Sequence, residues 1–162
     1  SITSLDAGDS WASGTGLPPV GESEFLSFSP AFGHLLFMGV DVGGGAADLL
    51  FASQDYGVTW SLRTDLSKTI PQAGIRGLEI DPAASEVVWA YGQGGLYHSQ
   101  DGGASFTPED EFVNDDISAL DVVNGAGGLR ILAFRANRSA PPVAVKQMNG
   151  NRCSTHTCTP RT

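Results

Sequence analysis

The octapeptide SQDYGVTW at residues 53–60 recurs as SQDGGASF at residues 99–106, and both copies have the form Ser-Gln-Asp-x-Gly-x-(Thr/Ser)-aromatic. A weaker copy, SLDAGDSW, stands at residues 4–11. The copies begin about 46 to 49 residues apart. A repeat of this period indicates a chain built from one supersecondary unit that is used several times.

Each shared position of the octapeptide has a physical task in a tight β-hairpin turn. The Asp carboxylate accepts hydrogen bonds from backbone N–H groups just after it, which closes the turn. The Gly adopts a positive φ at which a side chain would clash, and the closing aromatic side chain buries a large apolar surface. We therefore predict structural roles for Ser4, Asp6, Gly8, Trp11, Ser53, Asp55, Gly57, Trp60, Ser99, Asp101, Gly103 and Phe106.

At these residues the chain resembles the Asp-box, or BNR, repeat family of β-propellers. We call each copy of the octapeptide a box. The resemblance implies that the boxes lie at the outer rim of the propeller, away from its central site. The box aspartates would then serve the fold and take no part in catalysis. For Trp11, Trp60 and Phe106 we expect core packing between adjacent sheets, with an aromatic sugar-binding platform as the alternative.

Pro, Gly and Asp residues divide the chain into units that read as strand, turn, strand, turn, strand, box, strand. The strands predicted before the second and third boxes are 24–29, 34–41, 48–53, 75–80, 86–91 and 96–99. A further unit has predicted strands at 117–123, 129–136 and 143–148, followed by Asn149-Gly150 in place of a box. Four-stranded units of this length are typical of propeller blades.

We therefore predict an all-β fold, a propeller of four-stranded antiparallel Asp-box blades that spans residues 1–162. The outer hairpin of a blade is expected at 1–20, with blades at 21–67, 68–112 and 113–162, the last with a degenerate box. No segment shows a sustained helical period.

About three and a half blades are too few for a closed ring, because propellers typically have four to eight. Three explanations are open. The chain is a fragment of a larger propeller with a processed or truncated N-terminus, which is the interpretation we favour. Alternatively, it assembles with copies of itself or with another chain, or its strands form a smaller, non-circular stack.

Charge and hydropathy exclude several partner classes. The formal net charge is −9, and Lys68 and Lys146 are the only lysines. A basic face for a phosphate backbone is therefore not expected, and neither nucleic acid nor an anionic membrane is a predicted partner. No apolar run approaches the roughly 18 to 20 residues that span a bilayer, so membrane insertion is not predicted.

Cys153 and Cys158 are the only cysteines. Their spacing differs from a C-x-x-C motif, and His156 between them adds too few ligands for a zinc site. A small disulfide, two free thiols and a metal pair are the alternatives, and the disulfide is the interpretation we adopt. A disulfide favours a secreted or extracytoplasmic location. We expect no metal and no cofactor.

Asp41 is the one candidate catalytic residue. It opens the segment DVGGG at 41–45, which resembles the Asp-(Ile/Val)-Gly-Gly element of xyloglucan-cleaving glycoside hydrolases built from Asp-box propellers. The resemblance implies that Asp41 is a catalytic base, although this chain lacks the aromatic residue and the arginine that follow in that family. Two-carboxylate hydrolysis also needs a second acid, for which the sequence offers Asp115, Asp116 and Asp121.

The function predicted from the sequence is non-catalytic binding or assembly outside the cytoplasm. Sortilin-type receptors and photosystem assembly factors of the repeat family have such roles. The expected partner is a protein or glycan ligand, together with copies of the chain or the remainder of a larger propeller. The alternative is a fragment of a secreted glycoside hydrolase with Asp41 as its base. A sialidase is disfavoured, because no arginine motif for an anionic substrate is visible.

Overall fold

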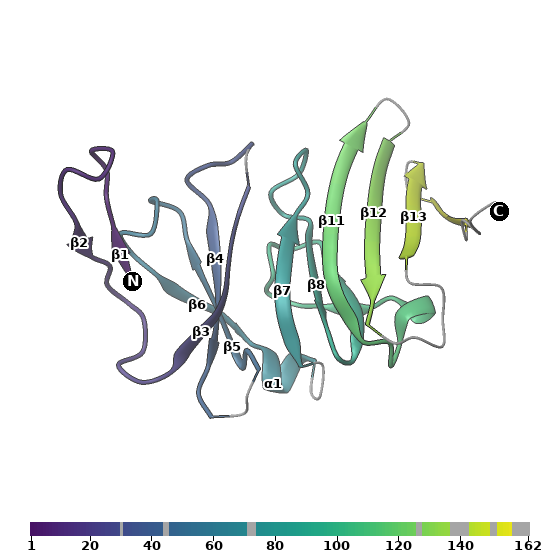
Figure 1. Cartoon of the computed structure of the whole chain (residues 1–162), viewed down its shortest axis with the longest axis horizontal. Helices are drawn as coiled ribbons and strands as arrows, with labels where there is room; N and C mark the ends of the chain where they lie inside the picture. Colours follow the sequence, from purple (N-terminus) through teal and green to yellow (C-terminus); the bar gives the residue numbers. More distant parts are fainter. Residues whose placement is uncertain are drawn as a thin grey trace.

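The computed structural model describes residues 1–29, 31–43, 46–70, 74–125, 128–136, 143–149 and 152–156, the last two segments as backbone alone. Along the chain, a two-stranded N-terminal hairpin is followed by three four-stranded antiparallel sheets (Figure 1). No helix in the described part of the chain is long and apolar enough to cross a membrane.

The hairpin and the first sheet contain β1 Ile2–Thr3, β2 Ala12–Ser13, β3 Glu22–Phe28, β4 Leu36–Asp41, β5 Leu49–Ser53 and β6 Ser61–Asp65. The second sheet contains β7 Ile75–Ile80, β8 Val88–Gly92, β9 Gly95–Ser99 and β10 Thr107–Pro108. The third contains β11 Ile117–Gly125, β12 Gly128–Arg135, β13 Val143–Asn149 and β14 Arg152–His156. A short helix, α1 Leu66–Thr69, and a 3-10 turn, η1 Asp110–Phe112, lie in the connections between sheets.

Each four-stranded sheet keeps its strands in chain order, with β3, β7 and β11 as the first strands. These three strands contact one another from sheet to sheet, β3 against β7 and β7 against β11. Neighbouring sheets therefore converge on their first strands, which we call the inner strands. The chain is an all-β partial propeller, and the predicted fold class is confirmed.

Apolar side chains fill the space between neighbouring sheets. Strand β8 shows how, because successive side chains of a strand point to opposite faces. Val88 and Ala90 belong to the core shared with the first sheet, whereas Trp89 belongs to the core shared with the third sheet. A smaller core, formed by Met38, Val40, Phe51 and Trp60 with Leu17, joins the first sheet to the N-terminal hairpin.

The box turn of the second sheet is closed by its own side chains. The Ser99 hydroxyl accepts the Gly103 N–H at 2.8 Å and donates to Asp101 Oδ1 at 2.7 Å. The other Asp101 oxygen accepts the Ser105 hydroxyl at 2.6 Å, and Oδ1 also accepts the Ser105 N–H at 2.9 Å. Gly103 has a φ of 82°, a left-handed conformation that favours glycine.

The two earlier boxes repeat these contacts. The Gly57 N–H lies 2.9 Å from the Ser53 hydroxyl, and the Gly8 N–H lies 2.7 Å from the Ser4 hydroxyl. Asp55 accepts both the N–H and the hydroxyl of the residue four positions on, and Asp6 does the same. Three turns with related sequences therefore form the same hydrogen-bond network.

The aromatic residues that close the boxes differ in burial. Trp60 is 6 % exposed and Phe106 is 8 % exposed, and each packs against the preceding sheet or hairpin. Trp11 is 62 % exposed. The expectation that all three pack between sheets is thus wrong for Trp11, because the hairpin stands at one end of the row of described sheets (Figure 1).

The third sheet continues without a box. Asn149 pairs with Arg152 across β13 and β14, so its third and fourth strands are antiparallel neighbours. The backbone of Cys153 lies in β14. Its side chain and the whole of Cys158 lie outside the described residues, and the disulfide stays a prediction.

The hydroxyl of Ser99 provides a test of turn closure. Ser99→Ala should lower the free energy of unfolding by about 1–3 kcal/mol, because the buried Gly103 N–H loses its acceptor. Denaturant unfolding monitored by tryptophan fluorescence measures this change. Ser61→Ala is the matched control, since its exposed hydroxyl lies 3.4 Å from its acceptor, and a change within about 0.5 kcal/mol is expected. Equal effects of the two substitutions would contradict the assigned role.

The box carboxylates predict an acid-dependent loss of stability. The Ser105 hydroxyl is the largest cause that lowers the pKa of Asp101. The pKa of Asp6 is lowered to about 2, with the Ser10 hydroxyl as the largest of several hydrogen-bond causes. Unfolded aspartates titrate near 3.9, so this stabilisation is complete above about pH 4 and is lost as the pH falls toward 2. Urea midpoints between pH 5 and 2.5 should therefore decrease, and less steeply in Asp101→Asn. Parallel pH profiles for the two proteins would refute the prediction.

Candidate functional site

The candidate site lies at the edge where the inner strands β3, β7 and β11 begin, which we call the start edge. Because neighbouring strands are antiparallel, β4, β6 and β12 end there. It is the lower edge in Figure 1, where α1 lies, and the box turns occupy the opposite edge. Asp41, the last residue of β4, is therefore separated from the box aspartates.

Asp41 is the last residue of β4 and contacts the backbone that follows it. Its Oδ1 accepts the Gly43 N–H at 2.6 Å, and Asp48 Oδ2 accepts the Val42 N–H at 3.1 Å. Glu22 is directly opposite Asp41 in the β3–β4 register, which places the two side chains on the same face. The sequence offered no signal for Glu22, because the pairing of two strands is a tertiary property.

Two of the acids nominated as partners of Asp41 form ion pairs. Asp115 Oδ2 lies 2.5 Å from Arg135 Nε, and Asp116 Oδ1 lies 2.5 Å from Arg76 Nη1. The Arg135 guanidinium also lies 5.1 Å from the centroid of the Phe112 ring. These acids hold the start of β11 to the end of β12 and to the start of β7.

The third nominated acid, Asp121, lies on β11 and acts on Glu79 of β7. Burial raises the pKa of Glu79, and the charge of Asp121 raises it further. Burial also raises the pKa of Tyr91, with a smaller contribution from Glu79. The Tyr91 ring covers its register partner Gly77, where a Cβ atom would lie 2.3 Å from the tyrosine oxygen. Glu79 and Asp121 thus form an acidic pair between the inner strands of two sheets.

All three inner strands have a bulge close to the start edge. The register skips one residue in each, namely Glu24 in β3, Arg76 in β7 and Ser118 in β11. A bulge bends the strand and redirects a side chain, and bulges are over-represented beside functional sites. A single sequence cannot reveal them, because a bulge exists only relative to the partner strand.

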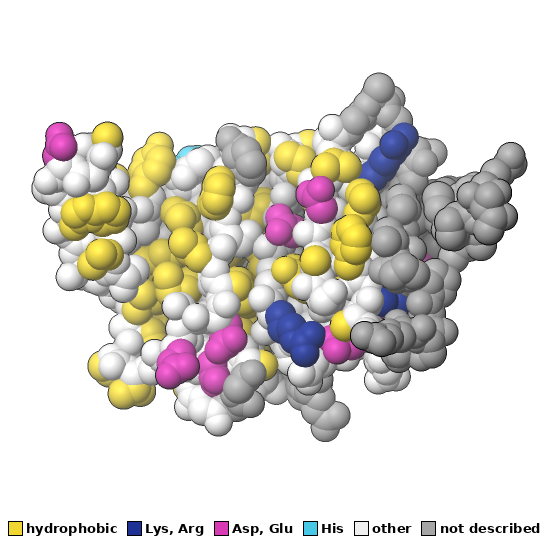
Figure 2. Space-filling model, viewed as in Figure 1, with side chains coloured by type: hydrophobic (Ala, Val, Ile, Leu, Met, Phe, Trp, Pro, Cys, Tyr) yellow, Lys and Arg dark blue, Asp and Glu magenta, His cyan; other side chains and the backbone are white. Residues whose placement is uncertain are grey.

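The inner strand β3 also exposes apolar side chains. Leu26 is 57 % exposed and Phe28 is 61 % exposed, whereas Ser27 between them is buried. Figure 2 shows hydrophobic side chains over the hairpin and the first sheet and acidic side chains along the lower edge of this face. The register partners of Leu26 and Phe28 are Met38 and Leu36, so the first two side chains lie on the hairpin-facing side of the first sheet, above an acidic border.

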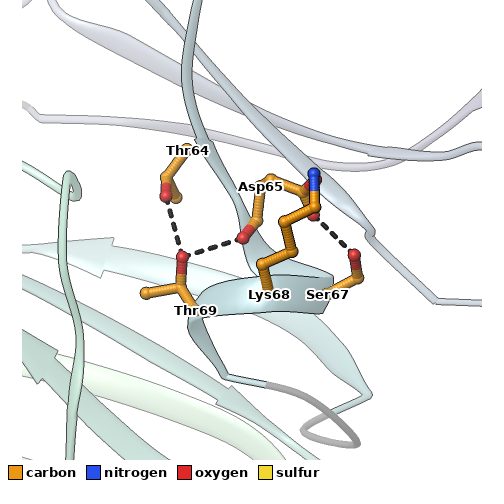
Figure 3. Close-up of polar contacts among 5 residues, drawn as sticks. All are labelled: Thr64, Asp65, Ser67, Lys68 and Thr69. Carbon is orange, nitrogen blue, oxygen red and sulfur yellow. Dashed lines mark hydrogen bonds and ion pairs between the residues drawn. The ribbon is translucent and has the colours of Figure 1, made fainter.

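Helix α1 carries a compact polar cluster at the start edge (Figure 3). Lys68 Nζ lies 2.6 Å from Asp65 Oδ2, and the Ser67 hydroxyl donates to Asp65 Oδ1. The Lys68 ammonium is the largest cause that lowers the pKa of Asp65. Thr69 donates to the Asp65 carbonyl at 2.8 Å and accepts from Thr64 at 3.0 Å. The polar groups of this cluster hydrogen-bond to one another. We therefore assign them a structural role in the connection between β6 and β7.

A groove of about 500 Å³ opens at the opposite edge, between the first and second sheets, with Trp60 and Glu86 among its lining residues. Arg63 of β6 crosses it. The Arg63 guanidinium donates to the Gly102 carbonyl at 2.7 Å and to the Asp101 carbonyl. Arg63 thus connects the first and second sheets, and we assign the groove to the packing interface between them.

The described residues contain no cluster of side chains that could bind a metal ion. No three His, Cys, Asp or Glu side chains in that part of the chain are placed to share an ion. The cluster of acids at 109–116 includes Glu109, whose Oε1 lies 2.8 Å from His98 Nδ1, and the two acids paired with arginines.

No protein-family model matches the chain, and no curated protein matches it. Among solved structures, the GH74 enzyme of Niastella koreensis aligns with a TM-score of 0.63 at 19 % identity, over 82 % of this chain and 22 % of that one. The GH74 xyloglucanase of Xanthomonas campestris gives 0.58 at 17 %, over 86 % and 24 %. YCF48 bound to D1 peptide gives 0.58 at 15 %, over 96 % and 47 %.

These similarities establish a propeller-like fold and nothing finer, because all three identities lie below 20 %. The chain spans less than half the length of each of the three proteins. Both catalytic and peptide-bound proteins share this fold, so the fold alone does not assign a function.

Proposed function

We propose that this chain is a non-catalytic binding module of a secreted or extracytoplasmic protein. The proposal rests on the observation that acids nominated for catalysis already form hydrogen bonds or ion pairs within the chain. Asp41 accepts a hydrogen bond from its own turn, and Asp115 and Asp116 are paired with arginines. A glycosidase carboxylate must instead be aimed at the scissile bond or at a water beside it.

The proposal includes an Asp-box architecture with an outer hairpin at 1–20 and blades at 21–67, 68–112 and 113–162. The repeated contacts among serine, aspartate and glycine in the three boxes support it. The extracytoplasmic location depends on the predicted Cys153–Cys158 disulfide.

The exposed apolar side of the inner strand β3 is the proposed binding surface, and a polypeptide is the proposed ligand. Leu26 and Phe28 offer exposed apolar contacts, and such residues mark interaction sites when they are grouped. Glu22 and Glu24 on the same strand favour basic side chains in the ligand. A peptide is bound to YCF48, a protein of similar fold, which supports a protein ligand in general terms. A glycan is the second ligand class.

Panning a phage-displayed peptide library on the whole chain tests the surface. We expect enriched peptides that contain basic and apolar residues, with binding weakened roughly tenfold or more by Phe28→Ser. Leu62→Ser is the control, because Leu62 is 55 % exposed on the outer strand β6. Failure to enrich any peptide, or equal weakening by both substitutions, would overturn the assigned surface.

A glycoside hydrolase is the second candidate function. It is favoured by the GH74 enzymes among the structural neighbours and by Glu22, which stands opposite Asp41 as a second carboxylate. The two functions differ in a simple respect, since only the hydrolase needs an ionisable group at position 41.

Xyloglucan hydrolysis separates the two candidates. We expect the wild-type chain and Asp41→Asn to release no more reducing ends than buffer alone. The Asn variant keeps a side-chain oxygen for the Gly43 N–H, so the turn should survive the substitution. Release by the wild type that disappears in Asp41→Asn would replace the binding proposal with the hydrolase.

A further inference from the structure

Trp11 holds the conformation of a buried box tryptophan although its ring is exposed. Its indole N–H donates to the Gly8 carbonyl at 3.1 Å, and the Trp60 indole N–H donates to the Gly57 carbonyl at 3.0 Å. The two side chains nevertheless differ in exposed fraction, 62 % against 6 %. The hairpin therefore presents a preformed aromatic surface together with two neighbours, Ile2 at 68 % and Leu5 at 71 % exposure.

Trp60 and Phe106 occupy the same position in their boxes as Trp11, and their contacts show which element packs against a box aromatic. Trp60 packs against the N-terminal hairpin, where Ser1 Oγ accepts its indole N–H at 3.1 Å and Leu17 packs against its cluster. Phe106 shares a core with Phe37 and Leu50 of the first sheet. In both cases the cover is the neighbouring antiparallel element on the N-terminal side. A β-sheet of the same kind is therefore the shape that fits Trp11.

The third sheet offers an outward face that lacks a neighbour in the described chain. In β12, Ile131 and Ala133 point into the core shared with the second sheet, so the alternate residues point outward. Phe134 on this outward side is 40 % exposed, and Arg130 is exposed. Val123, the register partner of Arg130, is also 40 % exposed. By the same alternation Asp121, the register partner of Leu132, lies on this side, so the face combines apolar side chains with charges of both signs.

The N-terminal part of the chain, which contains the hairpin, is acidic, and the C-terminal part, which contains most of the third sheet, is basic. Residues 1–62 contain seven Asp or Glu and no Lys or Arg. Residues 128–162 contain six Lys or Arg and no Asp or Glu. Two chains with a net charge of −9 repel each other on average, but an approach of the acidic end of one to the basic end of the other is attractive.

We propose that two copies of this chain associate head to tail, with the N-terminal hairpin of each copy covering the outward face of the third sheet of the other. Trp11 and its apolar neighbours are the centre of each contact, and the opposite charges of the two ends select this orientation. The pair is closed and has two-fold symmetry, because the hairpin of each copy contacts the third sheet of the other. Association is independent of the ligand-binding proposal, because Leu26 and Phe28 lie on β3 of the first sheet, whereas the hairpin and the third sheet make the contact.

Sedimentation velocity of the whole chain in low salt tests the proposal. The expected mass at high protein concentration is twice 16.9 kDa, and Trp11→Ser should sediment as the monomer. Arg130→Glu should weaken association, and salt should weaken it in the wild type. Trp11→Phe, which keeps an aromatic ring, should still associate. Since Trp11 is exposed in the single chain, its substitution should leave the circular dichroism spectrum and unfolding midpoint of the monomer unchanged.

Acrylamide quenching supplies a second measurement. Trp60 and Trp89 are buried, so accessible tryptophan emission reports Trp11. The accessible fraction should fall as the wild-type concentration rises and should be absent at all concentrations in Trp11→Ser. A wild-type chain that stays at 16.9 kDa, with Trp11 accessible throughout, overturns the proposal. A pair that survives unchanged in Trp11→Ser also overturns it, because association would then use another surface.

Discussion

Closure of the box turn by the Ser hydroxyl and the Asp carboxylate is the constraint from which the sheet arrangement follows. In the second sheet these two side chains satisfy the N–H groups of Gly103 and Ser105, so a sharp turn forms without unpaired backbone donors. The turn then places Phe106 at the position where it reaches the preceding sheet. Local hydrogen bonding and packing between sheets are thereby linked in each repeat.

The two edges of the sheets have different roles as a result. The box edge is committed to the fold, and Arg63 reinforces it by donating to a box turn of the next sheet. The start edge carries the bulges, the ion pairs of Arg76 and Arg135, and Asp41. Variation at the start edge leaves turn closure intact, which is the reason that a propeller can accept different functions on one fold.

The end faces of the sheet row follow from the same repeat. Trp60 and Phe106 pack on the element before them, whereas in the described chain Trp11 of the hairpin is exposed and Phe134 of the third sheet is partly exposed. Both faces have the chemistry of an interior sheet contact. The acidic residues of one end of the chain and the basic residues of the other favour one orientation, which hydrophobic burial alone would not select.

The sequence by itself determined the all-β class, the sheet order and the residues of the box turns, because turn chemistry and strand periodicity are local properties that recur with each repeat. Only the tertiary structure decided that Glu22 faces Asp41, that Glu24, Arg76 and Ser118 are bulged, and that Asp115 and Asp116 are paired with arginines. It also decided that Trp11 is exposed while Trp60 is buried. Register, ion pairing and burial depend on neighbours that are distant in sequence, and no local pattern encodes them.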